Sequence, residues 1–353
     1  MTNRWRTAAG TGSLLLAALA APALSNDLPS AVRTESAVTA TNKGLIEKYV
    51  KDQLTRMADP ATAGVARDEI TRQAEQTPTV TPSSSFLTTY TDAVAANIGP
   101  MIDPTAEVNK RLNGAIVTAK LSRSTPNRSL LPVAQKVMKD ESAAVAMWGL
   151  KAGAAHLEQT LTVPLWFKGQ TLTASIVEGG KRHLEAGPVV QTAYDSLYLT
   201  GTKLPGDAYK TCVTAMNELL VARTALYKAG VPASPQADQV AMTFFAVQDV
   251  RPVILSDPKL RVDTVQNCLN LIKAAADRVP SASQGEAQTQ VMAVLTRTSS
   301  AMAVLFNQQP AVSALFQRIA SQKLPLNANV QQDIAAAADA VSKLAEFKTV
   351  KAP

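Results

Sequence analysis

The chain has 353 residues, a formal net charge of +7, 46% hydrophobic residues and few aromatic side chains. This length and apolar content suffice for two domains or one elongated array with a substantial core. The positive charge is modest and spread over both halves, which argues against a nucleic-acid-binding protein. Frequent alanine and the lack of strand-like alternation predict an all-α fold.

Residues 1–25 have the features of a signal peptide. Arg4 and Arg6 precede a short apolar core, and Ala21-Pro22-Ala23 or Ala23-Leu24-Ser25 supplies small residues for cleavage. The core is too short to span a membrane, and no later apolar run approaches the roughly 18 residues that a span needs. We therefore expect an exported protein, periplasmic or extracellular, without a transmembrane anchor. Loss of the two arginines lowers the formal net charge from +7 to +5.

Residues 26–40 show no sustained periodicity and are expected to form a surface linker. From residue 41 to 163 the apolar spacing predicts three helical hairpins, the clearest at 129–158. Each hairpin turn holds an aspartate, Asp59, Asp103 or Asp140, and these are separated by 44 and 37 residues (59 to 103 and 103 to 140). A side-chain oxygen at such a turn can accept a hydrogen bond from the free amides of the next helix.

Valines follow these aspartates at five or six positions, namely Val65, Val108 and Val145, and we expect all three to be buried between their helices. With Leu130-Leu131-Pro132, Asp140, Val145 and Lys151, residues 42–160 resemble HEAT repeats, whose period is about 40 residues. The basic residue that this family often places after the valine is replaced by Ala66, Asn109 and Ala146. An ordinary bundle of hairpins with aspartate caps is the alternative fold.

The resemblance implies that the second helix of each hairpin lines a concave face. Arg67, Lys110, Arg111 and Lys151 would then form a basic strip along that face. Such a strip would bind an acidic protein segment or an anionic envelope component through contacts that weaken with salt. The alternative is that these residues only form a solvated helix surface.

Pro164 and Gly169 interrupt the pattern around Trp166 and Phe167, so we place a domain boundary between residues 163 and 164. The two aromatic residues could contact a partner or seal the end of the array. Residues 164–353 are predicted to form a separate helical bundle. Its helices are expected at roughly 171–185, 188–199, 207–228, 235–250, 258–278, 285–306, 310–321 and 327–347.

No recognised motif for a cofactor, metal or catalytic site occurs. His156 and His183 are the two histidines, and neither has a histidine or cysteine at zinc-ligand spacing. His156 is expected in the last turn of a helix. Cys212 and Cys268 both lie on apolar helix stripes, and in an oxidising compartment they are expected to form a disulfide, the alternative being two buried thiols.

These features favour an exported, non-catalytic interaction scaffold that binds a protein or an anionic envelope component, with no cofactor and no nucleic acid as partner. Its candidate partner-binding residues are Arg67, Lys110, Arg111, Lys151, Trp166 and Phe167. Two alternatives are an exported hydrolase or lyase with its site at the junction of the two halves, and a small-molecule binding protein. Converging carboxylates or histidines in a deep pocket would favour the enzyme.

Overall fold

The computed structural model describes residues 27–125, 127–162, 166–199 and 204–353, and these residues form an all-α protein without strands. The predicted signal peptide lies outside the described residues. None of the helices in the described part combines the length and the apolar character that crossing a membrane requires.

Most of the helices form two rows that advance together along the chain. The first row contains α2 (Ala40–Met57), α4 (Ser84–Asn97), α6 (Leu131–Met138), α8 (Trp166–Arg182), α10 (Gly206–Ala229), α13 (Pro258–Arg278) and α16 (Val330–Ser342). The second row contains α3 (Ala63–Arg72), α5 (Val108–Ser124), α7 (Ala143–Thr162), α9 (Gly187–Leu197), α11 (Gln239–Phe245), α14 (Glu286–Leu305) and α15 (Pro310–Ala320). Shorter elements are α1 (Ser30–Thr34), α12 (Arg251–Ser256) and the 3-10 turns η1 (Gly99–Met101), η2 (Arg128–Leu130), η3 (Pro235–Asp238) and η4 (Ala345–Phe347).

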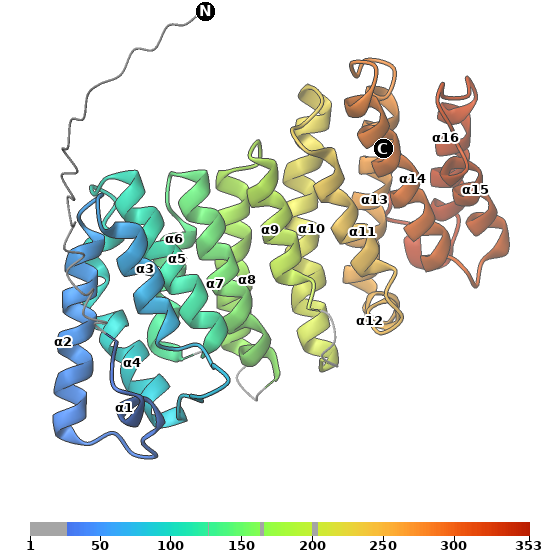
Figure 1. Cartoon of the computed structure of the whole chain (residues 1–353). Helices are drawn as coiled ribbons and strands as arrows, with labels where there is room; N and C mark the ends of the chain where they lie inside the picture. The colour runs from blue at the N-terminus through green and yellow to red at the C-terminus, as the bar shows by residue number, and fades with distance from the viewer. Residues whose placement is uncertain (1–26, 126, 163–165, 200–203) are drawn as a thin grey trace, which may run out of the picture.

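Helices pack on their neighbours within a row and across the two rows. In the second row α3, α5, α7 and α9 contact one another in turn, and in the first row α8, α10, α13 and α16 do the same. Across the rows α2 packs on α3, α6 on α7 and α13 on α14. Figure 1 shows the resulting order, with α2 at one end of the molecule and α15 and α16 at the other. The second predicted hairpin differs from expectation, because α4 packs mainly on α2 and α5 on α3 and α7.

The three predicted aspartate turns share one local hydrogen bond. The Oδ1 atoms of Asp59, Asp103 and Asp140 each accept from the backbone N–H two residues later, at 3.0, 2.9 and 2.8 Å. Such side-chain turns reverse the chain and satisfy amides that precede the next helix. Asp257 is a direct N-cap, since its Oδ1 accepts from the Leu260 N–H at 2.9 Å and Pro258 begins α13.

The predicted burial of the three valines is confirmed for one and wrong for two. Val145 is fully buried, whereas Val65 is 57% and Val108 48% exposed. The buried stripe of α3 consists of Ala63, Ala66 and Ile70, so Val65 lies on another side of the helix. The aspartate turns recur, but α3, α5 and α7 begin at different distances after them. A valine five or six residues after the aspartate therefore does not point to the same side of each helix.

The hydrophobic core consists of two clusters that meet on the third hairpin. One cluster extends from Leu28 to Val145 and the other from Ala119 to Val350, and Trp148 packs against both. Leu28 and Val32 are buried, so the segment expected to be a surface linker contains α1 and contributes to the core. The division at residue 164 stays a prediction, and buried apolar residues are continuous between α7 and α8.

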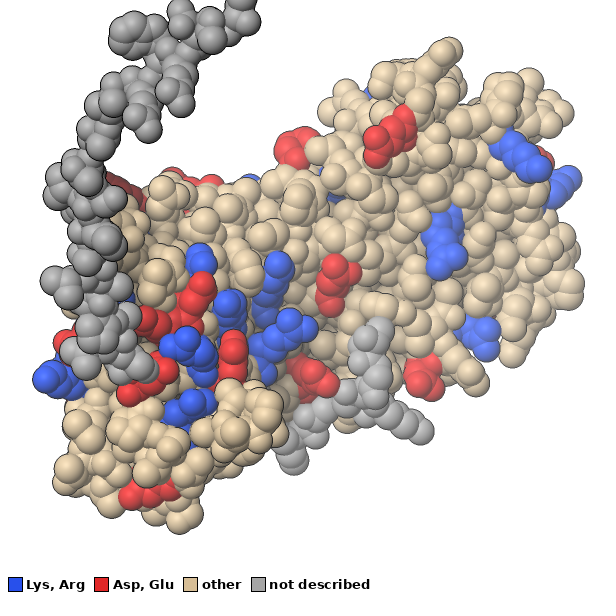
Figure 2. Space-filling model, viewed as in Figure 1, with Lys and Arg blue, Asp and Glu red and all other residues tan. Residues whose placement is uncertain are grey.

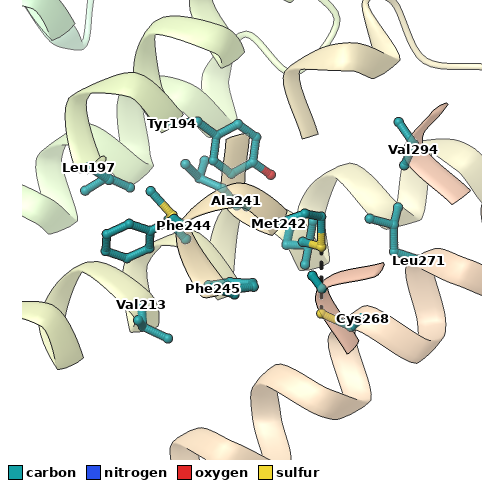
Figure 3. Packing of buried hydrophobic residues seen from close by; sticks show 14 of the residues in the cluster. Tyr194, Leu197, Val213, Ala241, Met242, Phe244, Phe245, Cys268, Leu271 and Val294 are labelled. Carbon is teal, nitrogen blue, oxygen red and sulfur yellow. Dashed lines mark hydrogen bonds between the residues drawn. The ribbon is translucent and has the colours of Figure 1, made fainter. Parts of the chain in front are cut away.

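The two cysteines are free thiols in the structure, which differs from the predicted disulfide. Both are fully buried, and burial raises the pKa of each thiol to about 12. The Cys268 Sγ atom points at the Met242 Sδ atom on α11, at 3.9 Å (Figure 3). The inward helix faces were therefore predicted correctly, but the sulfur atoms pack as small apolar groups.

Candidate binding groove

A groove of about 880 Å³ crosses the second row of helices between α5, α7 and α9. It lies where the helical hairpins meet the second half of the chain, on both sides of the predicted domain boundary. Its lining includes Ala119, Lys120, Ser122, Arg123, Trp148, Lys151, Ala154, Ala155, Glu158, Gln159, Thr192, Asp195, Ser196, Tyr198 and Leu199. Figure 2 shows basic and acidic side chains gathered on the N-terminal half of the visible face, while the remainder carries few charges.

Three cations from two helices line this groove. Lys120 and Arg123 lie three residues apart on α5, and Lys151 lies on α7. Arg123 and Lys151 are exposed, and neither pairs with a carboxylate in the part of the chain that the structure describes. The Lys120 Nζ atom is 3.8 Å from Asp68 Oδ1, which is a weak exposed pair. Two of these cations are therefore available to a ligand.

The groove also presents aromatic surface at fixed positions. Trp148 is half-buried, and the Lys151 Nζ atom lies 4.3 Å from the centre of its ring. Tyr198 lies on the α9 side and packs edge-on against Phe244, with ring centres 5.4 Å apart. Cations next to rigid aromatic rings can hold both the charge and the apolar part of a polypeptide ligand.

Small residues on α5 and α7 make room for the groove. Ala154 and Ala155 are half-buried on its lining, and Ala119 faces it from α5. Larger side chains at these positions would fill the space between the helices. The alanine-rich sequence, which favours close helix packing, thus also leaves an open channel at this place.

Of the predicted basic strip, only Lys151 lies in the groove. Arg67 is half-buried on α3, where its Nη1 atom donates to Asn113 Oδ1 at 3.3 Å and its Nε atom to Asp68 Oδ1 at 3.1 Å. Lys110 is half-exposed near the beginning of α5, whereas Lys120 and Arg123 are near its end. The rise of a helix, about 1.5 Å per residue, separates Lys110 from them.

The assignment of Arg111 to the strip is wrong, because its side chain is buried and engaged. Its Nε atom donates to Asp140 Oδ2 at 2.8 Å and its Nη2 atom to Asp140 Oδ1 at 3.2 Å. Its Nη1 atom donates to the carbonyls of Pro104 and Ala106. The Asp140 carbonyl in turn accepts from His183 Nε2 at 2.8 Å. Arg111 therefore joins two turns of the fold and is not available to a partner.

Trp166 and Phe167 are the first two residues of α8, and their side chains lie outside the described part of the structure. Their role as a partner site or as a seal stays a prediction. The residues that sequence reasoning missed are Lys120, Arg123, Trp148, Tyr198 and Leu199. The spacing of three residues in Lys120–Arg123 and Trp148–Lys151 was visible in the sequence, but only the packing of α5, α7 and α9 unites the two pairs.

A serine and a histidine are hydrogen bonded beneath the groove. Ser122 Oγ is 3.0 Å from His156 Nε2, and burial lowers the pKa of His156 to about 4. The two residues are 0% and 3% exposed, and both lie within helices. His156 is thus six residues before the end of α7 and not in its last turn as predicted. A catalytic serine must be accessible to its substrate and needs free hydrogen-bond donors beside it. Ser122 and His156 are buried within helices, so we interpret them as a buried polar pair.

On the first row of helices, several cations pair with carboxylates of a neighbouring helix, whereas the exposed Lys48, Lys51, Lys136 and Lys259 form no ion pair within the described residues. Lys139 pairs with Glu178 at 2.8 Å, and Lys181 with Glu218 at 3.1 Å. Lys210 pairs with Asp257 across α10 and α13. These pairs connect successive helices, whereas Arg123 and Lys151 remain without a carboxylate. In the groove of the second row these two cations lie close to Trp148, and the acidic side chains of Glu158 and Asp195 also line it.

No group of three or more potential metal ligands occurs within the described residues. Comparisons with protein-family models, with curated proteins and with solved structures give no match for this chain.

Proposed function

We propose that this protein is an exported, non-catalytic interaction scaffold and that the groove between α5, α7 and α9 binds an acidic segment of another polypeptide. The observation that carries this proposal is the pair of exposed, carboxylate-free cations, Arg123 and Lys151, beside the half-buried Trp148 ring. Unpaired charges at the rim of a groove attract an oppositely charged partner and bind it in a salt-dependent way.

The HEAT-like interpretation belongs to the same proposal. The recurring aspartate turns and the two rows of successively packed helices support it, because repeat proteins stack similar units along one axis and bind partners along their length. In such an array the second helices form one continuous binding surface. Export is supported by the order of charged, apolar and small residues in the first 25 positions.

A binding titration tests the proposal. A fluorescent decaglutamate peptide is titrated with the protein at low salt, and anisotropy gives the affinity. We expect the double variant Arg123→Ser, Lys151→Ser to bind about tenfold more weakly, as loss of two exposed charge contacts implies. The matched control is Arg128→Ser, Lys323→Ser, which removes one Arg and one Lys that are also exposed and unpaired in the described structure.

The control should bind as the unmodified protein does, and raising the salt should weaken binding to both. Equal loss in the two double variants would mean that only net charge matters, which contradicts a defined groove. No binding of the peptide at low salt would contradict the acidic ligand. Selective binding of a small anion such as glutamate would instead favour the small-molecule alternative.

A further inference from the structure

The groove between α5, α7 and α9 carries charges of both signs. Besides its three cations, two carboxylates line it, those of Glu158 on α7 and Asp195 on α9. Glu158 already interacts within the protein. Asp195 is exposed and accepts a hydrogen bond from Gln191 Nε2 at 3.0 Å, but it forms no ion pair within the described residues. Asp195 is therefore the carboxylate of this groove that remains for a cationic group of a ligand.

The cations of α5 and the carboxylate of Asp195 lie on different sides of α7. Helix α7 packs against both α5 and α9, and Figure 1 shows the three helices in this order along the second row. Ser122 Oγ of α5 is 3.0 Å from His156 Nε2 of α7, and Ser196 Oγ of α9 is 3.2 Å from the Leu150 carbonyl oxygen of α7. The α5 side of the groove is thus basic, and the α9 side is acidic.

The distance between these two sides determines which ligands can contact both. Packed helices lie about 8–10 Å apart, so α5 and α9 are separated by up to roughly 16–20 Å across α7. An extended polypeptide advances about 3.3 Å per residue, and about five or six residues therefore reach from the cations of α5 to Asp195. Lys151 and Trp148 of α7 line the groove between these two sides.

The opposite charges of the groove do not neutralise one another. Lys151 and Asp195 both line it, yet they form no ion pair in the described structure. A uniformly acidic ligand is attracted by the cations and repelled by Asp195. A ligand with a basic residue at its α9 end satisfies both signs of charge, and partners that carry only one sign are disfavoured. The groove therefore distinguishes ligands by the order of their charges and not only by net charge.

We propose that the acidic segment bound in this groove is flanked by a basic residue, which pairs with Asp195 while the acidic residues contact the cations of α5 and α7. This inference rests on the proposed function, because it concerns the same groove and the same acidic segment. It adds which partner sequences the groove accepts and how the segment lies, with its basic end on α9. The contact with Asp195 is exposed and should weaken with salt, as the contacts of the cations do.

Two labelled peptides of equal length test the basic flank. The peptide KKSSEEEESSKK has lysines on both sides of its glutamates, so the direction in which the chain lies does not matter. The peptide SSSSEEEESSSS lacks the lysines. Both should bind the unmodified protein at low salt, as measured by fluorescence anisotropy. Binding of neither peptide would contradict the proposed function and this inference together, whereas binding of the serine-flanked peptide alone would overturn only the basic flank.

The substitution Asp195→Asn removes the charge of the proposed contact and keeps the size of the side chain. It should weaken binding of the lysine-flanked peptide about threefold, as loss of one exposed charge contact implies, and should not weaken binding of the serine-flanked peptide. Asp263→Asn, on α13, is the matched control, because it removes an exposed aspartate outside the groove and should change neither affinity.

Thermal unfolding followed by circular dichroism verifies that both variants are folded. An equal effect of Asp195→Asn and Asp263→Asn on the lysine-flanked peptide would mean that only net charge matters, which overturns the inference. Equal weakening of both peptides by Asp195→Asn would also overturn it, because the serine-flanked peptide has no basic residue to lose. In both cases the acidic segment itself remains tested by Arg123→Ser, Lys151→Ser, so the two proposals can fail separately.

Discussion

Arg223 and Asp238 form an ion pair from which solvent is entirely excluded. The Arg223 Nη2 atom lies 3.0 Å from Asp238 Oδ2, and both side chains are 0% exposed. Arg223 also donates to the carbonyls of Leu184, Ala233 and Ser234. Tyr194 and Tyr227 donate their hydroxyls to the Asp238 carboxylate. The network joins α9, α10, η3 and the loops beside them in the second half of the chain.

Removing one partner of this pair should strongly destabilise the protein. Arg223→Met leaves the Asp238 carboxylate buried without its counter-charge, and such a change costs about 3 to 5 kcal/mol. Urea denaturation followed by circular dichroism measures the loss in the free energy of unfolding. Arg182→Met is the control, because Arg182 forms an exposed pair with Glu178 and should cost at most about 1 kcal/mol. Similar costs for the two variants would contradict the role of the buried network.

Val145 and Val65 provide a matched pair for the buried stripe of the second-row helices. Val145→Asp would bury an unpaired carboxylate, so we expect a loss of more than about 4 kcal/mol or failure to fold. Val65→Asp places the same group in solvent and should change the free energy of unfolding by about 0.5 kcal/mol or less. Expression yield and the free energy of unfolding, obtained from urea denaturation, are measured for both variants. A well-folded Val145→Asp protein would show that the core is assigned wrongly.

His156 should make the stability fall as the pH decreases. Burial lowers its folded-state pKa from 6.5 to about 4, so between these values the unfolded chain binds the proton more readily. The stabilisation is fully present above about pH 6.5 and is lost progressively down to about pH 4, by roughly 3 kcal/mol in total. Urea denaturation across this range should show a steeper loss for the unmodified protein than for His156→Gln. If the free energy of unfolding falls equally with pH in both proteins, protonation of His156 is not the cause of the loss.

The thiols of Cys212 and Cys268 should react only after unfolding. Both are fully buried and have a pKa of about 12, so little thiolate forms at neutral pH. We expect almost no reaction with a thiol reagent in the native protein and reaction of both cysteines in denaturant without reductant. If no thiol reacts after unfolding, the cysteines are bonded to each other in the isolated protein.

The helix positions could be predicted from sequence because proline, glycine and aspartate mark many of the helix boundaries. The helix expected at 258–278 has those bounds, since Asp257 and Pro258 determine its start. The exposure of Val65 and Val108 could not be predicted, because one residue of difference in register turns a side chain to another side of a helix. The disulfide prediction had the same weakness, since it followed from two apolar stripes and not from the directions of the sulfur atoms.

The groove was only partly predictable. Lys151 was a candidate from its place in the third hairpin, but Lys120 and Arg123 join it through the packing of α5 on α7. Arg111 was misassigned because its partners, Asp140 and the carbonyls of the preceding turn, come from tertiary structure. A basic residue that bonds to a turn and one that faces solvent look alike in a single sequence.

The fluorescence of Trp148 tests most directly whether an acidic polypeptide binds in the groove between α5, α7 and α9. The chain has three tryptophans, so Trp5→Phe, Trp166→Phe leaves Trp148 as the only fluorophore of its kind. Titration with unlabelled decaglutamate should shift or quench its emission in parallel with the binding curve, and this change should disappear when Arg123→Ser and Lys151→Ser are added. Binding of the peptide without any change in Trp148 emission would place the ligand elsewhere and contradict the proposed groove.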